Sequence, residues 1–414
     1  MTAPASRAGV RALVTASATV TLATVVVNLA SYGLIATGTR VLGPDHYGEL
    51  AALLGLVFVG SVPAVTLQVV LARRVAAGER GGLGRAAVLT AVVVGAVAAA
   101  TVPVLSLVLH ISLPALVFLV VALPAVTLAG APTGAVQGLH LFGRLATLIV
   151  IAGVGRIGGG LAGLLAGGTA AAAMAGVAIG SWLALLAAAA AVRGPGRTVL
   201  AAPGEGRGPL GEIGYAALTM LGFAAISTAD VLLAHRYLPA EQAGLYGAGA
   251  IVTKAALWLP AAVTMIALPR LAVPTQRRAA LRVSALALAG IGVLEVAGIL
   301  LLGPFLFPLA VGEEYRPVID WLWLFALAGA VLAITQLVVM YRVAGTDRVV
   351  PVLLWTALTA EVIVVAFRHD TIGTIVIVAT ATAALVVLAG LLLPVRSRKT
   401  TEDPPVLGQF GVGL

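Results

Sequence analysis

Residues 86–109 read AAVLTAVVVGAVAAATVPVLSLVL, and no charged residue interrupts this run between Arg85 and His110. A helix needs roughly 20 predominantly apolar residues to cross a bilayer. Similar stretches recur on both sides of this one until about twelve fill the chain. They are residues 12–37, 50–72, 86–109, 113–135, 145–166, 169–192, 213–235, 243–268, 281–303, 319–341, 349–367 and 371–394. The sequence therefore predicts an all-α polytopic membrane protein.

The composition indicates that the solvent of this chain is lipid rather than water. Of 414 residues, 61% are hydrophobic and only 10% are charged, whereas soluble domains carry roughly 25% charged residues. The net charge of +9 does not indicate nucleic-acid binding, because the basic residues lie in short loops between apolar stretches. The chain has no cysteine, which excludes disulfides and thiolate metal centres.

The basic residues of the loops alternate between the two sides of the predicted spans. One side holds only Arg40, Arg236, Arg316 and Arg368, and the other holds Arg7, Arg11, Arg73, Arg74, Arg80, Arg85, Arg144, Arg193, Arg197, Arg207, Arg270, Arg277, Arg278, Arg282, Arg342, Arg348, Arg396, Arg398 and Lys399. Because cytoplasmic loops are enriched in Lys and Arg, the second side is predicted to be cytoplasmic, and both termini with it. The composition, rich in Ala, Val, Gly and Arg, indicates a GC-rich bacterial genome, so we expect the cytoplasmic membrane of a bacterium. The first apolar run exceeds the roughly 7–15 residues of a signal peptide, and we expect it to be an uncleaved span.

An internal repeat relates the two halves of the chain. RVLGPDHYG (40–48) follows the first span and RYLPAEQAG (236–244) follows the seventh, at an offset of 196 residues, and RVA (74–76) falls on RLA (270–272) at the same offset. Because six spans separate the copies, both halves have the same orientation in the membrane, as in transporters built from parallel repeats. The predicted domains are an N-terminal six-helix lobe (1–197), a cytoplasmic linker (198–212), a C-terminal six-helix lobe (213–395) and a cytoplasmic tail (396–414).

Several short motifs resemble one branch of a known superfamily of exporters. This branch is the polysaccharide transporters, or lipid-linked glycan flippases, of the multidrug/oligosaccharidyl-lipid/polysaccharide (MOP) exporter superfamily. The motifs are RVLGPDHYGEL (40–50), LARR (71–74), QGLHLFGR (137–144), DVLL (230–233), AGLYG (243–247) and LPRL (268–271). The resemblance covers nearly the whole chain in the number and order of its spans.

The resemblance implies two six-helix lobes around a central cavity that opens alternately to each side of the membrane. It implies a flippase, not an enzyme, that moves a polyprenyl-diphosphate-linked oligosaccharide, the precursor of a polysaccharide, across the cytoplasmic membrane. The implied partners are membrane lipid, this glycan and proteins of glycan assembly, and we expect a monomer. One alternative is a cation-coupled multidrug exporter on the same fold. Another is a membrane polymerase or ligase of polysaccharide assembly, which the short extracytoplasmic loops disfavour.

Five charged residues fall inside predicted spans, in the middle or outer half of the bilayer, where burying a charge costs about 2.5–3.5 kcal/mol. Arg156 and Lys254 come from opposite lobes and are predicted to bind the diphosphate, because an Arg fork and a Lys point charge both suit phosphate oxygens. Asp230, Glu361 and Glu295 are candidates for binding a coupling Na⁺ or H⁺. The alternative is structural pairing of Lys254 with Asp230 or Glu295. We expect no resident metal or organic cofactor.

Four further charges are candidates for a gate at the outer ends of the spans. Arg40 and Arg236 occupy equivalent positions of the repeat, with Asp45 and Glu241 close behind them in the sequence. Ion pairs among them would close the outer side of the cavity. The alternative is that each Arg only caps a local helix end, and Arg236 could instead pair with Asp230.

A glycine pattern in the fifth span has a structural interpretation. Residues 153–158, GVGRIG, match the dinucleotide motif G-x-G-x-x-G, but no strand precedes them, which argues against nucleotide binding. Gly155, Gly159, Gly163 and Gly167 instead recur every fourth residue. Such a smooth helix face allows a neighbouring membrane helix to approach closely, so the pattern predicts a tight helix pair.

Overall fold

The computed structural model describes residues 7–79, 81–192, 194–202, 210–260, 263–264, 267, 270–271, 273, 275–344 and 349–393. Every regular element in these ranges is helical. Ten of the described helices are long and apolar enough to cross a membrane, so the expectation of an all-α, multi-pass membrane fold is confirmed. The predicted tail (396–414) and residues 203–209 of the predicted linker (198–212) lie outside the described residues.

The helices follow the predicted spans in order. The first half contains α1 (Arg7–Ala76), α2 (Leu83–Leu109), α3 (Leu113–Gly138), α4 (Phe142–Gly167), α5 (Ala170–Ala191) and α6 (Pro195–Ala201). The second half contains α7 (Leu210–Tyr237), α8 (Ala240–Trp258), α10 (Arg277–Val311), the 3-10 helix η1 (Glu313–Trp321), α11 (Leu322–Ala344), α12 (Val349–Phe367) and α13 (Ile372–Leu392). The short η1 occupies the largest loop between spans, which had room for little else.

The first two predicted spans are two helices that meet at a sharp break inside α1. A loop was expected between residues 37 and 50, but both helices extend into this region, and the break is at Gly43, whose backbone has φ 64° and ψ 173°. Glycine adopts this left-handed φ without steric cost, and the following Pro44 has no N–H to continue the hydrogen-bond ladder. We call residues 7–42 the first arm of α1 and residues 44–76 its second arm.

Two further details were not predicted. A turn at Leu259 and Pro260 follows the end of α8 at Trp258, and the described residues 263, 264 and 267 of the span expected over 243–268 are again helical. Residues 195–201, across the boundary between the predicted N-terminal lobe and the predicted linker, form the short helix α6, which begins with Pro195 and docks on α2 through a hydrogen bond from the Gly82 N–H to the Ala202 carbonyl.

The predicted tight helix pair is confirmed by α4 and α5. A Cβ atom built on Gly159 would lie 2.2 Å from the Gly176 carbonyl oxygen, and one on Gly163 would lie 2.1 Å from the Ala172 carbonyl oxygen. Real Cβ atoms cannot approach an oxygen so closely, so only glycine permits this packing. The backbones of α4 and α5 therefore touch along the stripe that begins at Gly155.

Two alanine substitutions should distinguish the effect of the close α4–α5 contact on stability from the effect of helix propensity. Gly159→Ala should lower the thermal unfolding midpoint of the purified protein, because overpacking costs about 1–3 kcal/mol. Gly158→Ala is the matched control, since its Cβ would meet open space and alanine favours a helix by about 1 kcal/mol over glycine. Equal midpoints for the two variants would contradict the close α4–α5 contact.

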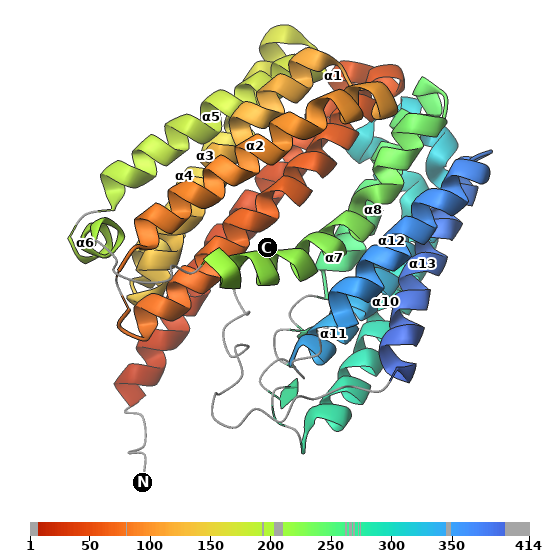
Figure 1. Cartoon of the computed structure of the whole chain (residues 1–414). Coiled ribbons are helices and arrows are strands. Elements are labelled where there is room, and N and C mark those ends of the chain that lie inside the picture. The colour runs from red at the N-terminus through yellow and green to blue at the C-terminus, as the bar shows by residue number, and fades with distance from the viewer. Residues whose placement is uncertain are drawn as a thin grey trace.

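The helices form two groups that lie close together at one end and diverge toward the other (Figure 1). The N-terminal group contains α1 to α5 and the C-terminal group contains α8 and α10 to α13, while α7 contacts α1, α8 and α12. The divergent end is the one where α1 begins and where Arg73 and Arg74 end its second arm. We call this end the Arg-rich side and the opposite end the Arg-poor side.

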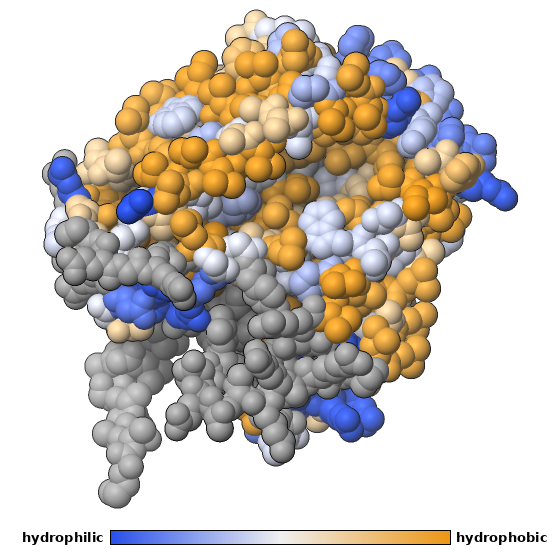
Figure 2. All heavy atoms as spheres, in the orientation of Figure 1, coloured by the Kyte–Doolittle hydropathy of each residue, from blue (hydrophilic) through white to orange (hydrophobic). Residues whose placement is uncertain are grey.

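The surface is apolar over the helix faces and hydrophilic mainly toward the ends of the molecule (Figure 2). The exposed apolar residues include Val92, Val93, Leu107, Leu294 and Leu301, which lie on α2 and α10. Such long apolar faces suit hydrocarbon rather than water. The largest buried cluster, in contrast, combines residues of both groups, among them Tyr47 and Tyr246.

Candidate functional site

The two helix groups meet through the duplicated motif found in the sequence. A Cβ on Gly48 of α1 would lie 3.1 Å from the Ala243 carbonyl carbon, and a Cβ on Gly244 of α8 would lie 1.8 Å from the Pro44 carbonyl oxygen. Gly48 and Gly244 are equivalent positions of the repeat, at the offset of 196 residues. We call this contact the glycine seam and define it by Pro44, Gly48 and Ala51 of α1 with Ala243, Gly244 and Gly247 of α8.

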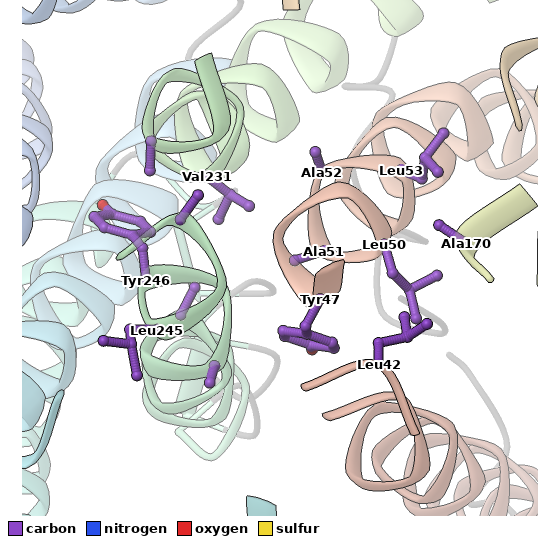
Figure 3. Close-up of a cluster of buried hydrophobic side chains, with 14 of the residues drawn as sticks. Leu42, Tyr47, Leu50, Ala51, Ala52, Leu53, Ala170, Val231, Leu245 and Tyr246 are labelled. Carbon is purple, nitrogen blue, oxygen red and sulfur yellow. The ribbon is translucent and has the colours of Figure 1, made fainter. Parts of the chain in front are cut away.

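The seam is packed without polar side chains. A Cβ on Gly247 would lie 2.7 Å from the Ala51 side chain. Tyr47 and Ala51 lie on the face of α1 nearest to α8, whereas Tyr246 points to the far side of α8 (Figure 3). The helix groups are thus held together by backbone approach, which the repeated small residues allow.

Lys254 lies on α8, beyond the end of the glycine seam in the direction of the Arg-rich side. Its ammonium group donates hydrogen bonds to the Ser227 carbonyl and, over 3.2 Å, to the Thr228 hydroxyl, both on α7. It also lies 5.2 Å from the centroid of the Phe58 ring of α1, and the Phe58 and Trp258 rings meet edge to face at 6.3 Å. Lys254 therefore sits at a junction of three helices from both halves of the chain.

Arg156 lies on α4, in the N-terminal group, and is half-buried. Its neighbours Gly153 and Gly160 face Val27 and Leu34 of the first arm of α1, whereas Gly155 faces α5. Within the described part of the chain, the Arg156 guanidinium has neither an ion pair nor a hydrogen bond. Arg156 makes no direct contact with Lys254, which lies on the other half of the chain.

Asp230 and Glu361 form a buried acidic pair in the second half of the chain. Asp230 of α7 is 6% exposed and accepts a 2.9 Å hydrogen bond from the Tyr246 hydroxyl of α8. Glu361 of α12 is fully buried, and neither of its carboxyl oxygens has a hydrogen-bond partner in the described chain. The two carboxyl groups are close enough to interact electrostatically. Such a pair can hold a proton or a small cation between its oxygens.

The hydroxyl groups of Ser227 on α7 and Thr380 on α13 donate hydrogen bonds within their own helices. Ser227 donates to the Ala224 carbonyl, and Thr380 donates over 2.7 Å to the Val376 carbonyl. Their oxygen lone pairs stay available to a cation. Over the residues that the structure describes, no cluster of three or more His, Asp or Glu side chains has the arrangement of a metal site.

Glu295 does not join this pair. It lies on α10, both its carboxyl oxygens are buried, and neither has a hydrogen-bond partner among the described residues. Among the described residues neither Glu295 nor Asp230 forms a direct salt bridge with Lys254, although the Asp230 carboxylate is close enough to attract the Lys254 ammonium group.

The gate candidates make contacts other than the ion pairs considered above. Arg40 donates a 2.7 Å hydrogen bond to the Leu309 carbonyl near the end of α10, which links the two helix groups. The Arg236 guanidinium lies 5.2 Å from the ring centroid of its neighbour Tyr237. Asp45 and Glu241 are exposed, and the ion pairs found in the described residues, Arg73–Glu212, Arg74–Glu212, Arg74–Glu79 and Arg316–Glu313, include none of the four.

Sequence reasoning missed a second interhelix contact on the Arg-poor side. The Tyr315 hydroxyl of η1 donates a 3.1 Å hydrogen bond to the Thr39 carbonyl, just before the break in α1. The rings of Tyr315 and Tyr47 also meet edge to face at 6.2 Å. This hydrogen bond joins η1 to the last turn of the first arm of α1. No local pattern could link residues so far apart in the sequence.

On the Arg-rich side, sequence reasoning also missed the role of two charged residues. Glu212, in the first turn of α7, pairs with both Arg73 and Arg74 at the end of α1. Arg342 is buried at 1% exposure and donates to the Gly390 and Leu393 carbonyls at the end of α13. Arg342 thereby supplies donors to carbonyls at a helix end, where backbone groups otherwise lack helical partners.

Comparisons with known proteins identify this arrangement. No protein-family model matches the chain, and no curated protein matches it either. Its structure is similar to that of an inward-facing multidrug resistance MATE transporter of the MOP superfamily, with a TM-score of 0.68 and 14% identity over 88% of this chain and 93% of that chain. It is also similar to the eukaryotic MATE transporter AtDTX14, with a TM-score of 0.63 and 14% identity over 92% of this chain and 94% of that one.

A third similar structure is that of a MOP superfamily transporter from Pyrococcus furiosus, described as having a binding pocket of reverse polarity. The TM-score is 0.51, with 16% identity over 90% of this chain and 92% of that chain. Sequence identities this low support a shared fold and nothing beyond it. The chain has the fold of the MATE transporters of the MOP superfamily.

Proposed function

We propose that this protein is a flippase that moves a polyprenyl-diphosphate-linked oligosaccharide across the cytoplasmic membrane of a bacterium by alternating access. The observation that carries the proposal is the position of Lys254. An ammonium group inside a membrane span is costly, and here it lies between the two helix groups at the end of their contact. A charge retained at that position suits a protein that carries an anion between the groups.

The geometry suggests a sequence of events. The glycine seam closes the Arg-poor side, and the helix groups diverge toward the Arg-rich side (Figure 1), which the positive-inside rule makes cytoplasmic. The diphosphate of a substrate from the cytoplasmic leaflet would bind to Lys254 and Arg156, while its polyprenyl chain stays in the lipid. Rocking of one helix group against the other would then open the seam to the outside.

A cation-coupled multidrug exporter is the second candidate function. The observation that favours it is the buried pair Asp230 and Glu361, because carboxylates attract cationic or amphipathic drugs as well as coupling ions. Among the similar structures is a multidrug resistance transporter of the same fold. The two candidates differ in the charge of the substrate at the junction.

Reconstitution distinguishes the two functions. Proteoliposomes containing the full chain would receive a fluorescent polyprenyl-diphosphate-linked N-acetylglucosamine in one leaflet, and dithionite quenching would report its transfer. Transfer above that of protein-free liposomes is expected, together with no uptake of ethidium. Ethidium transport without glycolipid transfer would favour the exporter and overturn the flippase.

Coupling is predicted to depend on Glu361. We propose that Glu361 and Asp230 share a proton or Na⁺ whose binding alternates with substrate binding. Glu361→Gln removes the charge but keeps the shape, so transfer should lose its dependence on an imposed proton or Na⁺ gradient. Glu313→Gln, at an exposed residue outside this pair, is the matched control and should keep the dependence. An unchanged gradient dependence in Glu361→Gln would remove this residue from coupling.

A further inference from the structure

Phe58 and Lys254 occupy equivalent positions of the two repeats, since the offset of 196 residues that aligns Gly48 with Gly244 also aligns Phe58 with Lys254. The two side chains meet, with the ammonium nitrogen 5.2 Å from the ring centroid. A contact between equivalent positions lies at the axis that relates two repeats. One repeat thus supplies a cation at the axis, and the other supplies the aromatic ring that covers it.

The ammonium group of Lys254 has no donor left for a ligand in this arrangement. A Lys ammonium has three N–H donors. The Ser227 carbonyl and the Thr228 hydroxyl accept two of them, and the π face of Phe58 occupies the remaining direction, where it interacts favourably with the cation. The contacts from α7 lie within the same half of the chain as Lys254, whereas Phe58 belongs to the other half. Phe58 is therefore the partner that an incoming anion would replace.

Displacement of Phe58 would also move the glycine seam, because Phe58 and the α1 residues of the seam lie on the same helix. Toward the Arg-poor side of Phe58, a Cβ on Gly55 would lie 2.5 Å from the Thr228 side chain. Ala51 and Gly48, which precede Gly55 on α1, pack closely against α8. These positions share one helix, so a ligand that inserts between Phe58 and Lys254 pushes the second arm of α1 away from α7 and α8 together.

We propose that Phe58 is a displaceable cover of an anion-binding site on Lys254, and that a diphosphate headgroup replaces it and thereby loosens the glycine seam. The inference rests on the proposed function and adds to it a reason why substrate binding would drive the change of access. An empty transporter keeps the seam closed because Lys254 holds Phe58. A loaded transporter loses that contact, and the binding energy of the anion offsets the loss.

Binding of a defined probe tests the cover. Farnesyl diphosphate serves as the lipid diphosphate, farnesol as the probe without phosphate, and pyrophosphate as the probe without lipid, each titrated calorimetrically into the full chain in nanodiscs. Phe58→Leu removes the aromatic face and should bind farnesyl diphosphate about fivefold more tightly than the parent protein. Phe58→Tyr keeps the face and should bind like the parent. Lys254→Gln should lose binding of both diphosphates.

A second measurement tests the link to the seam. In the natural chain, which has no cysteine, Ala51→Cys places one thiol in the seam. Farnesyl diphosphate, but not farnesol, should raise the rate at which a membrane-impermeant maleimide labels it. The Phe58→Leu background should already show part of this rise without ligand.

The outcomes separate this inference from the proposed function. Equal or weaker binding of farnesyl diphosphate by Phe58→Leu would overturn the cover while leaving Lys254 as the anion site. Tighter binding without any change in labelling at residue 51 would overturn the link to the seam. Absence of saturable binding of either diphosphate by the parent protein would overturn both the inference and the substrate role of Lys254.

Discussion

Gly244→Ala should force the glycine seam apart. The new methyl group would lie 1.8 Å from the Pro44 carbonyl oxygen, a distance that no relaxation of a side chain can relieve because the opposing atom is backbone. Overpacking of this kind costs about 1–3 kcal/mol, and a bias of 1.4 kcal/mol changes a population about tenfold. An arrangement in which α1 and α8 have separated avoids the cost, so the substitution should populate that arrangement.

The measurement uses a single thiol in each of two proteins. Cysteine at position 51 reports opening of the seam, and cysteine at the exposed position 46 reports that the Arg-poor side faces outward. In intact cells, an impermeant maleimide should label position 46 in both backgrounds, and position 51 about tenfold faster with Gly244→Ala than without it. Transfer of glycolipid should fall, because alternating access requires that the seam can close.

Gly290→Ala is the matched control for the seam. Gly290 lies on α10, and a Cβ there would meet open space, so the gain in helix propensity of about 1 kcal/mol comes without a clash. Labelling and transfer in this variant should match the parent. Unchanged labelling at position 51 in Gly244→Ala would contradict the closed seam, and no labelling at position 46 would contradict the proposed orientation.

Arg156→Ala should abolish glycolipid transfer while leaving the protein folded. The guanidinium lies within a membrane helix and has no ion pair or hydrogen bond in the described chain, so the fold gains nothing from its charge. A diphosphate would supply the missing partner. Charged hydrogen bonds contribute about 1.5–3 kcal/mol each, so loss of the fork should slow transfer at least tenfold.

Stability separates this role from a structural one. An unpaired charge inside the membrane costs about 2.5–3.5 kcal/mol, and Arg156→Ala should therefore keep or raise the thermal unfolding midpoint. Arg156→Lys should retain part of the activity, because it keeps the charge but not the planar fork. Full transfer by Arg156→Ala with a lowered midpoint would show that the residue serves the fold instead.

Local sequence determined the fold class, the order of the spans and the α4–α5 contact. Apolar runs such as residues 86–109 must become helices in lipid, because no water satisfies an exposed backbone there. The glycines at 155, 159 and 163 predicted a close pair, because only a surface without side chains lets two backbones touch. The repeat at Arg40 and Arg236 was also evident in the sequence, whereas the close contact that it makes between the two halves was not.

Only the tertiary structure decided which partners the polar residues have. The chain folds back at Gly43, and Tyr315, which is far from this segment in the sequence, donates a hydrogen bond to the Thr39 carbonyl. No periodicity in the sequence could predict a contact between residues so far apart. The charge of Lys254 was evident in the sequence, but its cover by Phe58 was not. Side-chain pairing depends on how whole helices are placed by packing, whereas the helices themselves depend on the solvent that each segment meets.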